Sequence, residues 1–221
     1  MPDFSWQPLW LTFKLAILTT GALLVVGAPL AYGLAHWESR FKYFVQTLVS
    51  MPLVLPPTVL GFYLLLLFNP ANMVGRFLDS TFDLRLVFTF EGLVVASVIY
   101  SLPFMVNPIQ AGFQSLPASL AEASYTLGKS RLQTFWKVLL PNLKPSLLTG
   151  TVMSFAHTVG EFGVILMIGG SIPGETKVAS IAIYEEVEAL NYQTANAYAL
   201  VLFSITFTIL LTVYLVNRRY L

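Results

Sequence analysis

Long apolar stretches, separated by polar loops, dominate the pattern along the chain. Five of them are long enough to cross the hydrocarbon core of a bilayer, which takes about 20 mostly apolar residues in a helix. They cover residues 9–35, 43–68, 86–109, 147–169 and 194–216. None shows the strict alternation of a barrel strand, and lipid offers no partners to free backbone groups. The pattern therefore predicts an all-α membrane protein with about five transmembrane helices.

The amino-acid composition also indicates that this chain lies in a membrane. Hydrophobic residues make up 56% and charged residues 10% of the 221 positions, whereas soluble domains carry about 25% charged residues. So few charges cannot cover a globular surface, which excludes an ordinary soluble enzyme and a disordered chain. No loop is long enough to bury a core of its own. We therefore expect a single transmembrane domain over residues 1–221.

Chemistry-bearing residues are scarce. The chain has no Cys and two His, His36 and His157, which leaves little for metal binding or acid–base catalysis. We expect no metal site and no cofactor. The net charge of +1 gives no bulk attraction for nucleic acid.

Basic residues divide unevenly between the two sets of loops. Eight lie on one side, namely Arg40, Lys42, Lys129, Arg131, Lys137, Lys144, Arg218 and Arg219. The other side carries four, namely Lys14, Arg76, Arg85 and Lys177, together with most of the acidic residues. The positive-inside rule places the more basic side in the cytoplasm. With five spans, the N-terminus is then outside and the C-terminus cytoplasmic.

The cytoplasmic loop over residues 110–146 has a pattern of its own. Pro117 suits a helix start, and Gly128 sits where a helix end belongs. A second amphipathic helix is expected to follow Gly128 and to end at Pro141 and Pro145. The pattern alone leaves two interpretations open. The first helix docks into a groove of another protein, or it lies on lipid headgroups.

One motif in this loop carries a family resemblance. The residues are Glu122, Ala123, Ser124, Gly128, Val138, Leu140 and Pro141. Their order and spacing resemble the EAA loop of ABC importer permeases, with Ser in place of the second Ala. The resemblance implies a coupling helix in which Glu122, Ala123 and Gly128 contact a separate cytoplasmic ATPase. Gly128-Lys129-Ser130 also matches the end of a P-loop, but Ala123 stands where that motif needs its first Gly, so we expect no nucleotide site here.

Two membrane segments resemble one group within this family, the molybdate permeases. They are the proline-rich run over residues 51–61 and the Gly160-Glu161-Phe162-Gly163 region with the Ile-Pro-Gly-Glu-Thr stretch that follows it. Sulfate and tungstate permeases share the second region in looser form. Pro56 and Pro57 remove helix donors. They mark either a gate or packing seam or an ordinary kink.

Glu161 is the only acidic residue deep within a predicted span, and His157 lies one helical turn before it. A charge at this depth is costly and marks a candidate functional site. The two residues are expected either to line the transport pathway or to form a structural pair between helices. A carboxylate would repel a dianion, so a gating or structural role is favoured over direct binding of molybdate.

The resemblance implies the remaining components. We expect the permease subunit of a molybdate importer in the plasma (inner) membrane of a prokaryote. It would pair with a second copy, two cytoplasmic ATPase subunits and an extracytoplasmic molybdate-binding protein. An acidic outer segment over residues 177–190 is either a docking surface for that binding protein or a solvated face. The alternatives are a sulfate or other oxyanion permease, a stand-alone secondary carrier, and an intramembrane enzyme, for which no catalytic motif appears in the spans.

Overall fold

The fold consists of helices joined by short loops. The computed structural model describes residues 4–217, so Arg218 and Arg219 lie outside the described residues. This described part contains helices and no strand, which confirms the all-α prediction. In chain order the elements are α1 (Gln7–His36), α2 (Phe41–Ser50), the 3-10 turn η1 (Met51–Leu53), α3 (Pro57–Phe68), α4 (Met73–Phe82), α5 (Phe90–Ser115), α6 (Ala118–Thr126), α7 (Arg131–Thr134), the π-turn η2 (Phe135–Leu139), α8 (Leu140–Asn142), α9 (Lys144–Val159), α10 (Gly163–Gly169), α11 (Ala179–Glu188) and α12 (Tyr192–Asn217).

Membrane spans are of two kinds in this fold. Helices α1, α5 and α12 are each long and apolar enough to cross a bilayer alone. Two further spans are bent pairs. The second span joins α2 and η1 to α3 through a bend of 113°, and the fourth joins α9 to α10 through a bend of 60°. Hydropathy alone shows no interruption in either span, although the prolines of the second are expected to mark a gate, a packing seam or a kink. The structure places a short non-helical break within each span.

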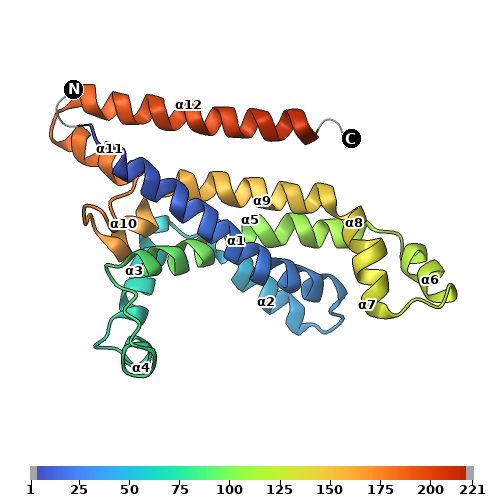
Figure 1. Ribbon diagram of the computed structural model, residues 1–221. Coiled ribbons are helices and arrows are strands. Elements are labelled where there is room, and N and C mark those ends of the chain that lie inside the picture. Colours follow the sequence, from blue (N-terminus) through green and yellow to red (C-terminus); the bar gives the residue numbers. More distant parts are fainter. Residues whose placement is uncertain (1–3, 218–221) are drawn as a thin grey trace.

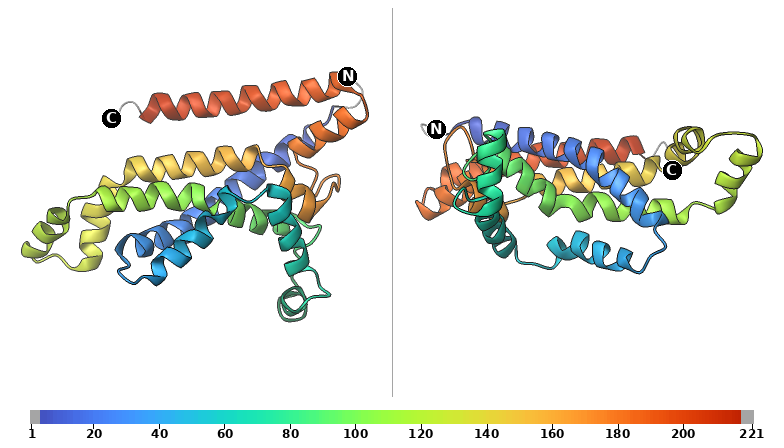
Figure 2. Two further views of the ribbon diagram at one scale, coloured as in Figure 1. Left: turned by 180° about the vertical axis from the view of Figure 1, so that it is seen from behind. Right: turned by 90° about the horizontal axis from the view of Figure 1, so that it is seen from below.

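The helices form an elongated bundle with distinct ends (Figures 1 and 2). Helices α1, α5 and α9 pack side by side along its length. Helices α4, α10 and α11 gather at one end, and α6, α7 and α8 gather at the other (Figure 1). Helix α1 begins at the α10 end, and α12 finishes toward the α6 end (Figure 1). The loop that carries the EAA-like motif and the outer acidic segment therefore lie at opposite ends of the bundle.

The bundle has two large hydrophobic cores and a third, smaller cluster where α1, α11 and α12 meet. The α10-end core includes Leu15, Leu64, Leu93, Ile165 and Ile168. The α6-end core includes Leu23, Leu34, Met105, Ile109 and Leu143. Buried hydroxyls lie between these cores along the three central helices, namely Thr19 and Thr20 on α1, Ser97 and Ser101 on α5, and Ser154 and Thr158 on α9.

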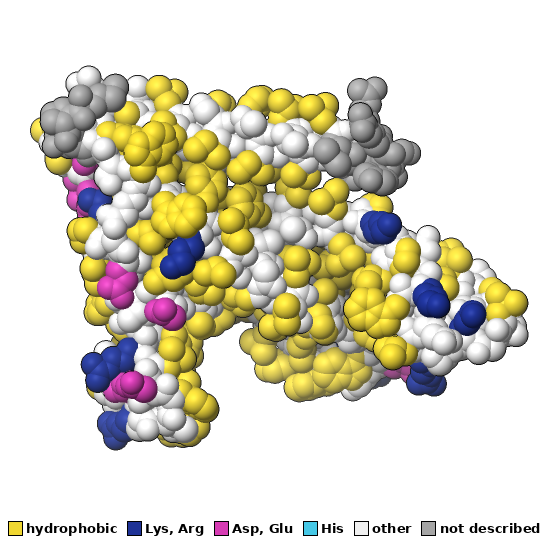
Figure 3. All heavy atoms as spheres, in the orientation of Figure 1, with side chains coloured by type: hydrophobic (Ala, Val, Ile, Leu, Met, Phe, Trp, Pro, Cys, Tyr) yellow, Lys and Arg dark blue, Asp and Glu magenta, His cyan; other side chains and the backbone are white. Residues whose placement is uncertain are grey.

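Charged side chains are concentrated at the two ends of the bundle, as the membrane-protein prediction requires. Figure 3 shows a largely apolar middle, with most acidic side chains of this face near the α10 end and mainly Lys and Arg at the α6 end. This separation matches the charge asymmetry of the loops.

Candidate coupling loop and span-break cavity

Helix α6 stands away from the bundle on a well-defined turn. Pro117 precedes it, and its end is closed by two hydrogen bonds: Gly128 N–H donates to the carbonyl of Tyr125 at 2.9 Å, and Lys129 N–H donates to that of Ser124 at 3.1 Å. This pair of bonds is a Schellman motif, whose residue at the Gly128 position adopts the left-handed region. Gly128 has φ +72°, a conformation that costs other residues about 1–2 kcal/mol. The turn therefore explains the Gly at this position of the motif.

The motif residues of α6 divide into exposed and buried positions. Glu122 and Ala123 are exposed, as a contact surface requires. Ser124 is buried, and its Oγ lies 2.9 Å from Oγ1 of Thr134 on α7. It therefore fastens α6 to α7 rather than facing a partner. The most exposed large apolar side chain of this segment is Leu127, at 77%. The motif does not include it.

Helix α7 continues through Pro141 instead of stopping there. Ser130 caps α7 in a reciprocal arrangement with Gln133, and η2 then widens the helix by one residue per turn before α8. A π-turn shifts the hydrogen-bond pattern, so Pro141, which lacks an N–H, is accommodated at the start of α8. The expected helix end at Pro141 is thus wrong. The direction changes at Leu143, which is buried in the α6-end core. Leu140 is half-buried and Pro141 is exposed.

The breaks of the second and fourth spans meet at one cavity of about 490 Å³. Predicted pathway residues Pro57, His157 and Glu161 all line it, although Pro57 lies at least 100 positions before the other two in the sequence. Pro56 is the residue directly before α3. Thr58 and Tyr100 complete the polar lining. Sequence reasoning did not single out these two side chains, because neither is charged and Tyr100 comes from a third span.

Glycines allow the two broken spans to touch. A Cβ on Gly163 would lie 2.9 Å from Cβ of Pro57, and one on Gly61 would lie 2.7 Å from Cβ of Met167. Both distances are too short for real side chains, so α3 and α10 approach each other through Gly on each side. These contacts hold α3 against α10, and Pro57 and Gly163 also line the cavity.

His157 and Glu161 do not form a pair. The helix ends between them at Gly160, so the helical spacing predicted from the sequence does not apply. Nδ1 of His157 lies 2.9 Å from Oγ of Ser101, and its ring stacks on Phe104 with centroids 4.1 Å apart. The imidazole is therefore held by α5.

Glu161 has an unusual environment. It is 3% exposed, and within residues 4–217 neither carboxyl oxygen has a hydrogen-bond partner. Its backbone carbonyl accepts a 2.7 Å hydrogen bond from Ser180 Oγ, which ties the break to α11. A buried polar group without a partner is costly, so this carboxyl is a candidate for a role that stability does not explain.

The outer acidic segment forms α11 and the turn after it, and its three acids are partnered within the chain. Glu185 lies 2.5 Å from Nζ of Lys177, Glu188 accepts a hydrogen bond from Tyr184, and Glu186 accepts one from Asn191. Burial raises the pKa of Glu185, but the hydrogen bond and charge of Lys177 outweigh it and the pKa is lowered. These acids stabilise the local turn structure.

Comparison with known proteins identifies the family. The family model described as "Binding-protein-dependent transport system inner membrane component" matches residues 24–221. The chain belongs to this family. It is therefore a multi-pass inner-membrane permease component, and the resemblance drawn from its motifs is confirmed.

Individual relatives cover almost the whole permease. A molybdenum transport system permease protein of Azotobacter vinelandii is 47% identical over 210 residues, covering 94% of this chain and 92% of the relative. A putative molybdenum transport system permease protein of Bacillus subtilis is 33% identical over 92% of this chain and 89% of the relative. A sulfate transport system permease protein of Salmonella typhimurium is 33% identical over 89% of this chain and 70% of the relative.

Solved structures share the fold of the permease. A bacterial ABC transporter that imports alginate matches with a TM-score of 0.77 at 18% identity, covering 98% of this chain and 80% of that one. The inward-facing MetNI methionine ABC transporter matches with a TM-score of 0.74 at 17% identity, covering 96% of this chain and 94% of that one. At these identities the likeness concerns the fold alone.

Proposed function

We propose that this permease is the membrane subunit of an ATP-driven importer that takes up molybdate. The substrate assignment rests on the 47% identity to a molybdenum permease over nearly the full length of both chains. Sulfate permeases are the second candidate, because they match at about one third identity over most of this chain.

The permease is oriented with α6 in the cytoplasm. The α6 end carries the larger share of Lys and Arg, which favours the cytoplasmic side. The exposed Glu122, Ala123 and Leu127 then face a cytoplasmic ATPase subunit. A helix that stands clear of the bundle and ends in exposed side chains suits insertion into a partner's groove.

A continuous series of packed elements links this contact to the cavity. Ser124 fastens α6 to α7, α7 runs through η2 and α8 to the buried Leu143, and α9 leads from there to the break at Gly160. Closure of two ATPase subunits on ATP would move α6, and this path would carry the displacement to the break. Opening of the cavity to either side in turn is alternating access, in which ATP binding favours one of two states.

Two copies of the permease frame the pathway. At the break of the second span, Val54 is 83% exposed within a single chain, and residues 54–56 are not helical. Irregular backbone at membrane depth is tolerated only when other protein covers it or when it lines a water-filled cavity. A second copy supplies that cover, and the two breaks then border a shared passage.

Capture of the anion belongs to an extracytoplasmic binding protein. The span-break cavity contains the buried Glu161 and no Lys or Arg in its lining, so it does not attract an oxyanion. Delivery by a partner removes the need for such attraction. The cavity then provides a passage and not a storage site.

Uptake of labelled molybdate tests the substrate. Cells with and without the gene are compared at nanomolar molybdate, with excess sulfate or tungstate as competitor. We expect uptake to require the gene and to resist sulfate. If sulfate uptake falls instead while molybdate uptake persists, the permease proposal stands and the substrate is sulfate.

Replacement of Gly128 tests the coupling. Gly128→Val forces a β-branched residue to φ +72°, at a cost of about 1–2 kcal/mol to the turn. No atom lies within 4 Å of the added Cβ, so the effect acts through the backbone alone. We expect weaker stimulation of the ATPase, and Gly128→Asn, which tolerates this conformation, serves as the control. Unchanged assembly and uptake in the Val variant would remove α6 from the coupling role.

A further inference from the structure

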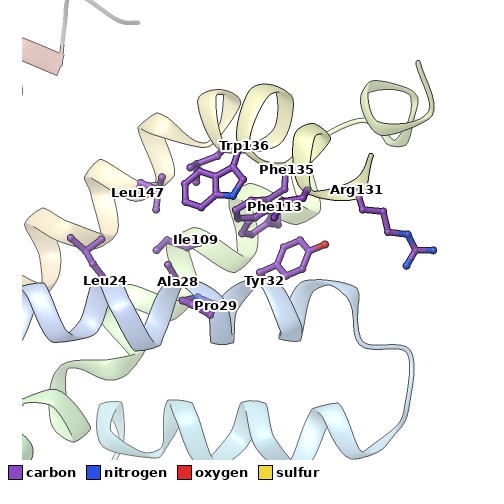
Figure 4. Close-up of a pocket in the computed structure, with 12 residues that line it drawn as sticks. Leu24, Ala28, Pro29, Tyr32, Ile109, Phe113, Arg131, Phe135, Trp136 and Leu147 are labelled. Atoms are coloured by element: carbon purple, nitrogen blue, oxygen red, sulfur yellow. The ribbon is translucent and has the colours of Figure 1, made fainter. Parts of the chain in front are cut away.

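An apolar groove opens beside α1 at the α6 end of the bundle. It has a volume of about 670 Å³ and lies between α1, α5 and the α7–η2 segment, within the 300–1,000 Å³ range usual for ligand pockets. Figure 4 shows Leu24, Ala28 and Leu147 toward one end of it, and Phe113 and Phe135 nearer the other. The groove is distinct from the span-break cavity, which shares no lining residue with it.

Charge is confined to one end of this groove. Arg131 is its only charged lining residue, and within residues 4–217 no carboxylate forms an ion pair with it. In Figure 4 the guanidinium of Arg131 and the hydroxyl of Tyr32 lie at the same end, away from Leu24 and Leu147. A groove with a long apolar part and one cationic end is complementary to an amphiphile with an apolar tail and a negative head.

We propose that this groove binds an anionic phospholipid, with one acyl chain along the apolar part and the phosphate at Arg131. The proposal rests on the proposed orientation, because the cytoplasmic membrane surface is where the α6 end then lies. Basic pockets between helices on that side suit anionic headgroups. An acyl chain in the groove would also cover its apolar side chains, which would otherwise have to be covered by another protein surface.

Trp136 provides a direct reporter because it lines the groove and is partly exposed. Replacement of Trp6, Trp10 and Trp37 by Phe leaves it as the only Trp of the full-length chain. The purified protein is titrated in mixed micelles with phosphatidylglycerol or phosphatidylcholine that carries the same brominated acyl chains. Quenching of the Trp136 fluorescence then measures occupancy of the groove by each lipid.

We expect phosphatidylglycerol to reach half-maximal quenching at a lower mole fraction than phosphatidylcholine. Arg131→Gln should raise the half-maximal fraction of phosphatidylglycerol about fivefold, the effect of losing one partly exposed ion pair. Lys129→Gln is the matched control, since Lys129 is exposed on the same segment but does not line the groove, and it should change nothing. Ala28→Leu should lower the maximal quenching by both lipids.

Two results would overturn the proposal. Equal quenching by both lipids that Arg131→Gln does not alter would mean ordinary annular lipid. Absence of quenching by either lipid would mean that protein, such as a second copy, covers the groove. Because the assay involves neither molybdate nor ATP, it succeeds or fails independently of the proposed transport function.

Discussion

The second and fourth spans are both interrupted by a non-helical break, but different residues build the two breaks. The second span turns by 113° between Leu53 and Pro57, and the fourth turns by 60° around Gly160. Prolines cause the first break by removing backbone donors. In the fourth span no proline is involved, and the helix stops at Gly160 and restarts at Gly163.

Their surroundings differ as much as their residues. The proline break exposes the apolar Val54, whereas the glycine break encloses the acidic Glu161. The first break thus leaves an apolar side chain uncovered within one chain, and the second buries a carboxyl that has no hydrogen-bond partner within residues 4–217. From this difference we propose that the proline break lies at the interface between two copies and that the glycine break moves during transport.

Replacement of Gly163 should have the largest effect on this arrangement. In Gly163→Ala the new Cβ meets the ring of Pro57 at 2.9 Å, and overpacking of this kind costs about 1–3 kcal/mol. We expect a lower thermal midpoint in detergent and a loss of uptake, because the two breaks are pushed apart.

Gly160→Ala is the matched control from the same break. Its added Cβ has no neighbour closer than 3.8 Å, and its expected cost is within about 0.5 kcal/mol. If both variants lost stability equally, contact with Pro57 would not be what holds the breaks together.

Neutralisation of Glu161 should separate stability from transport. Glu161→Gln removes an ionisable group that is buried without a partner, and we expect a gain of about 1 kcal/mol, seen as a rise of about 2–4 °C in the thermal midpoint. Uptake should fall, because a carboxyl without partners in this state is suited to gain them in the other state.

The two measurements are made on the same preparation. Normal uptake by Glu161→Gln would show that the acidic group takes no part in movement of the break. An unchanged midpoint would show that its burial carries no net cost.

The smallest effect on stability is expected at the proline break. Val54→Cys replaces an exposed side chain, so the free energy of unfolding should change by less than about 0.5 kcal/mol. The natural chain has no Cys, and a bifunctional thiol reagent should therefore join two copies only through this position.

Val25→Cys is the matched control, because Val25 is similarly exposed but belongs to the unbroken helix α1. We expect no covalent dimer from it. Monomeric Val54→Cys that reacts readily with a lipid-soluble maleimide would place the proline break against lipid and contradict its role at the interface.

The sequence was sufficient to predict the helices and the loop motif but not the geometry of the breaks. Apolar residues lie on both sides of residues 51–57 and of Gly160, so a hydropathy window averages over each interruption. A proline in the sequence shows that one backbone hydrogen-bond donor is missing, but it does not give the angle by which the span bends. The angle depends on packing of α3 against α10 through Gly61 and Gly163, a contact between distant parts of the chain.

Individual site residues show the same limit. The helix that carries Glu122 and Ala123 could be predicted from its pattern, whereas their role in a contact came only from the family resemblance. Burial of Ser124 could not be predicted, because it depends on Thr134 across the turn. Likewise, of the two alternatives for His157 and Glu161, a structural pair would have required a continuous helix. His157 instead meets Ser101 on α5, and both residues line the cavity.

Helix α12 has a consequence for the membranes in which this protein can work. It contacts α11 and, more weakly, α9, and most of its length carries exposed apolar side chains. Its 26 residues extend about 39 Å at 1.5 Å per residue, which exceeds the usual hydrocarbon thickness of about 30 Å. Helices α1 and α5 are as long or longer, but both are packed at the centre of the bundle. A helix with fewer contacts is freer to tilt when bilayer thickness changes, so lipid of a different chain length should first alter the tilt of the last span.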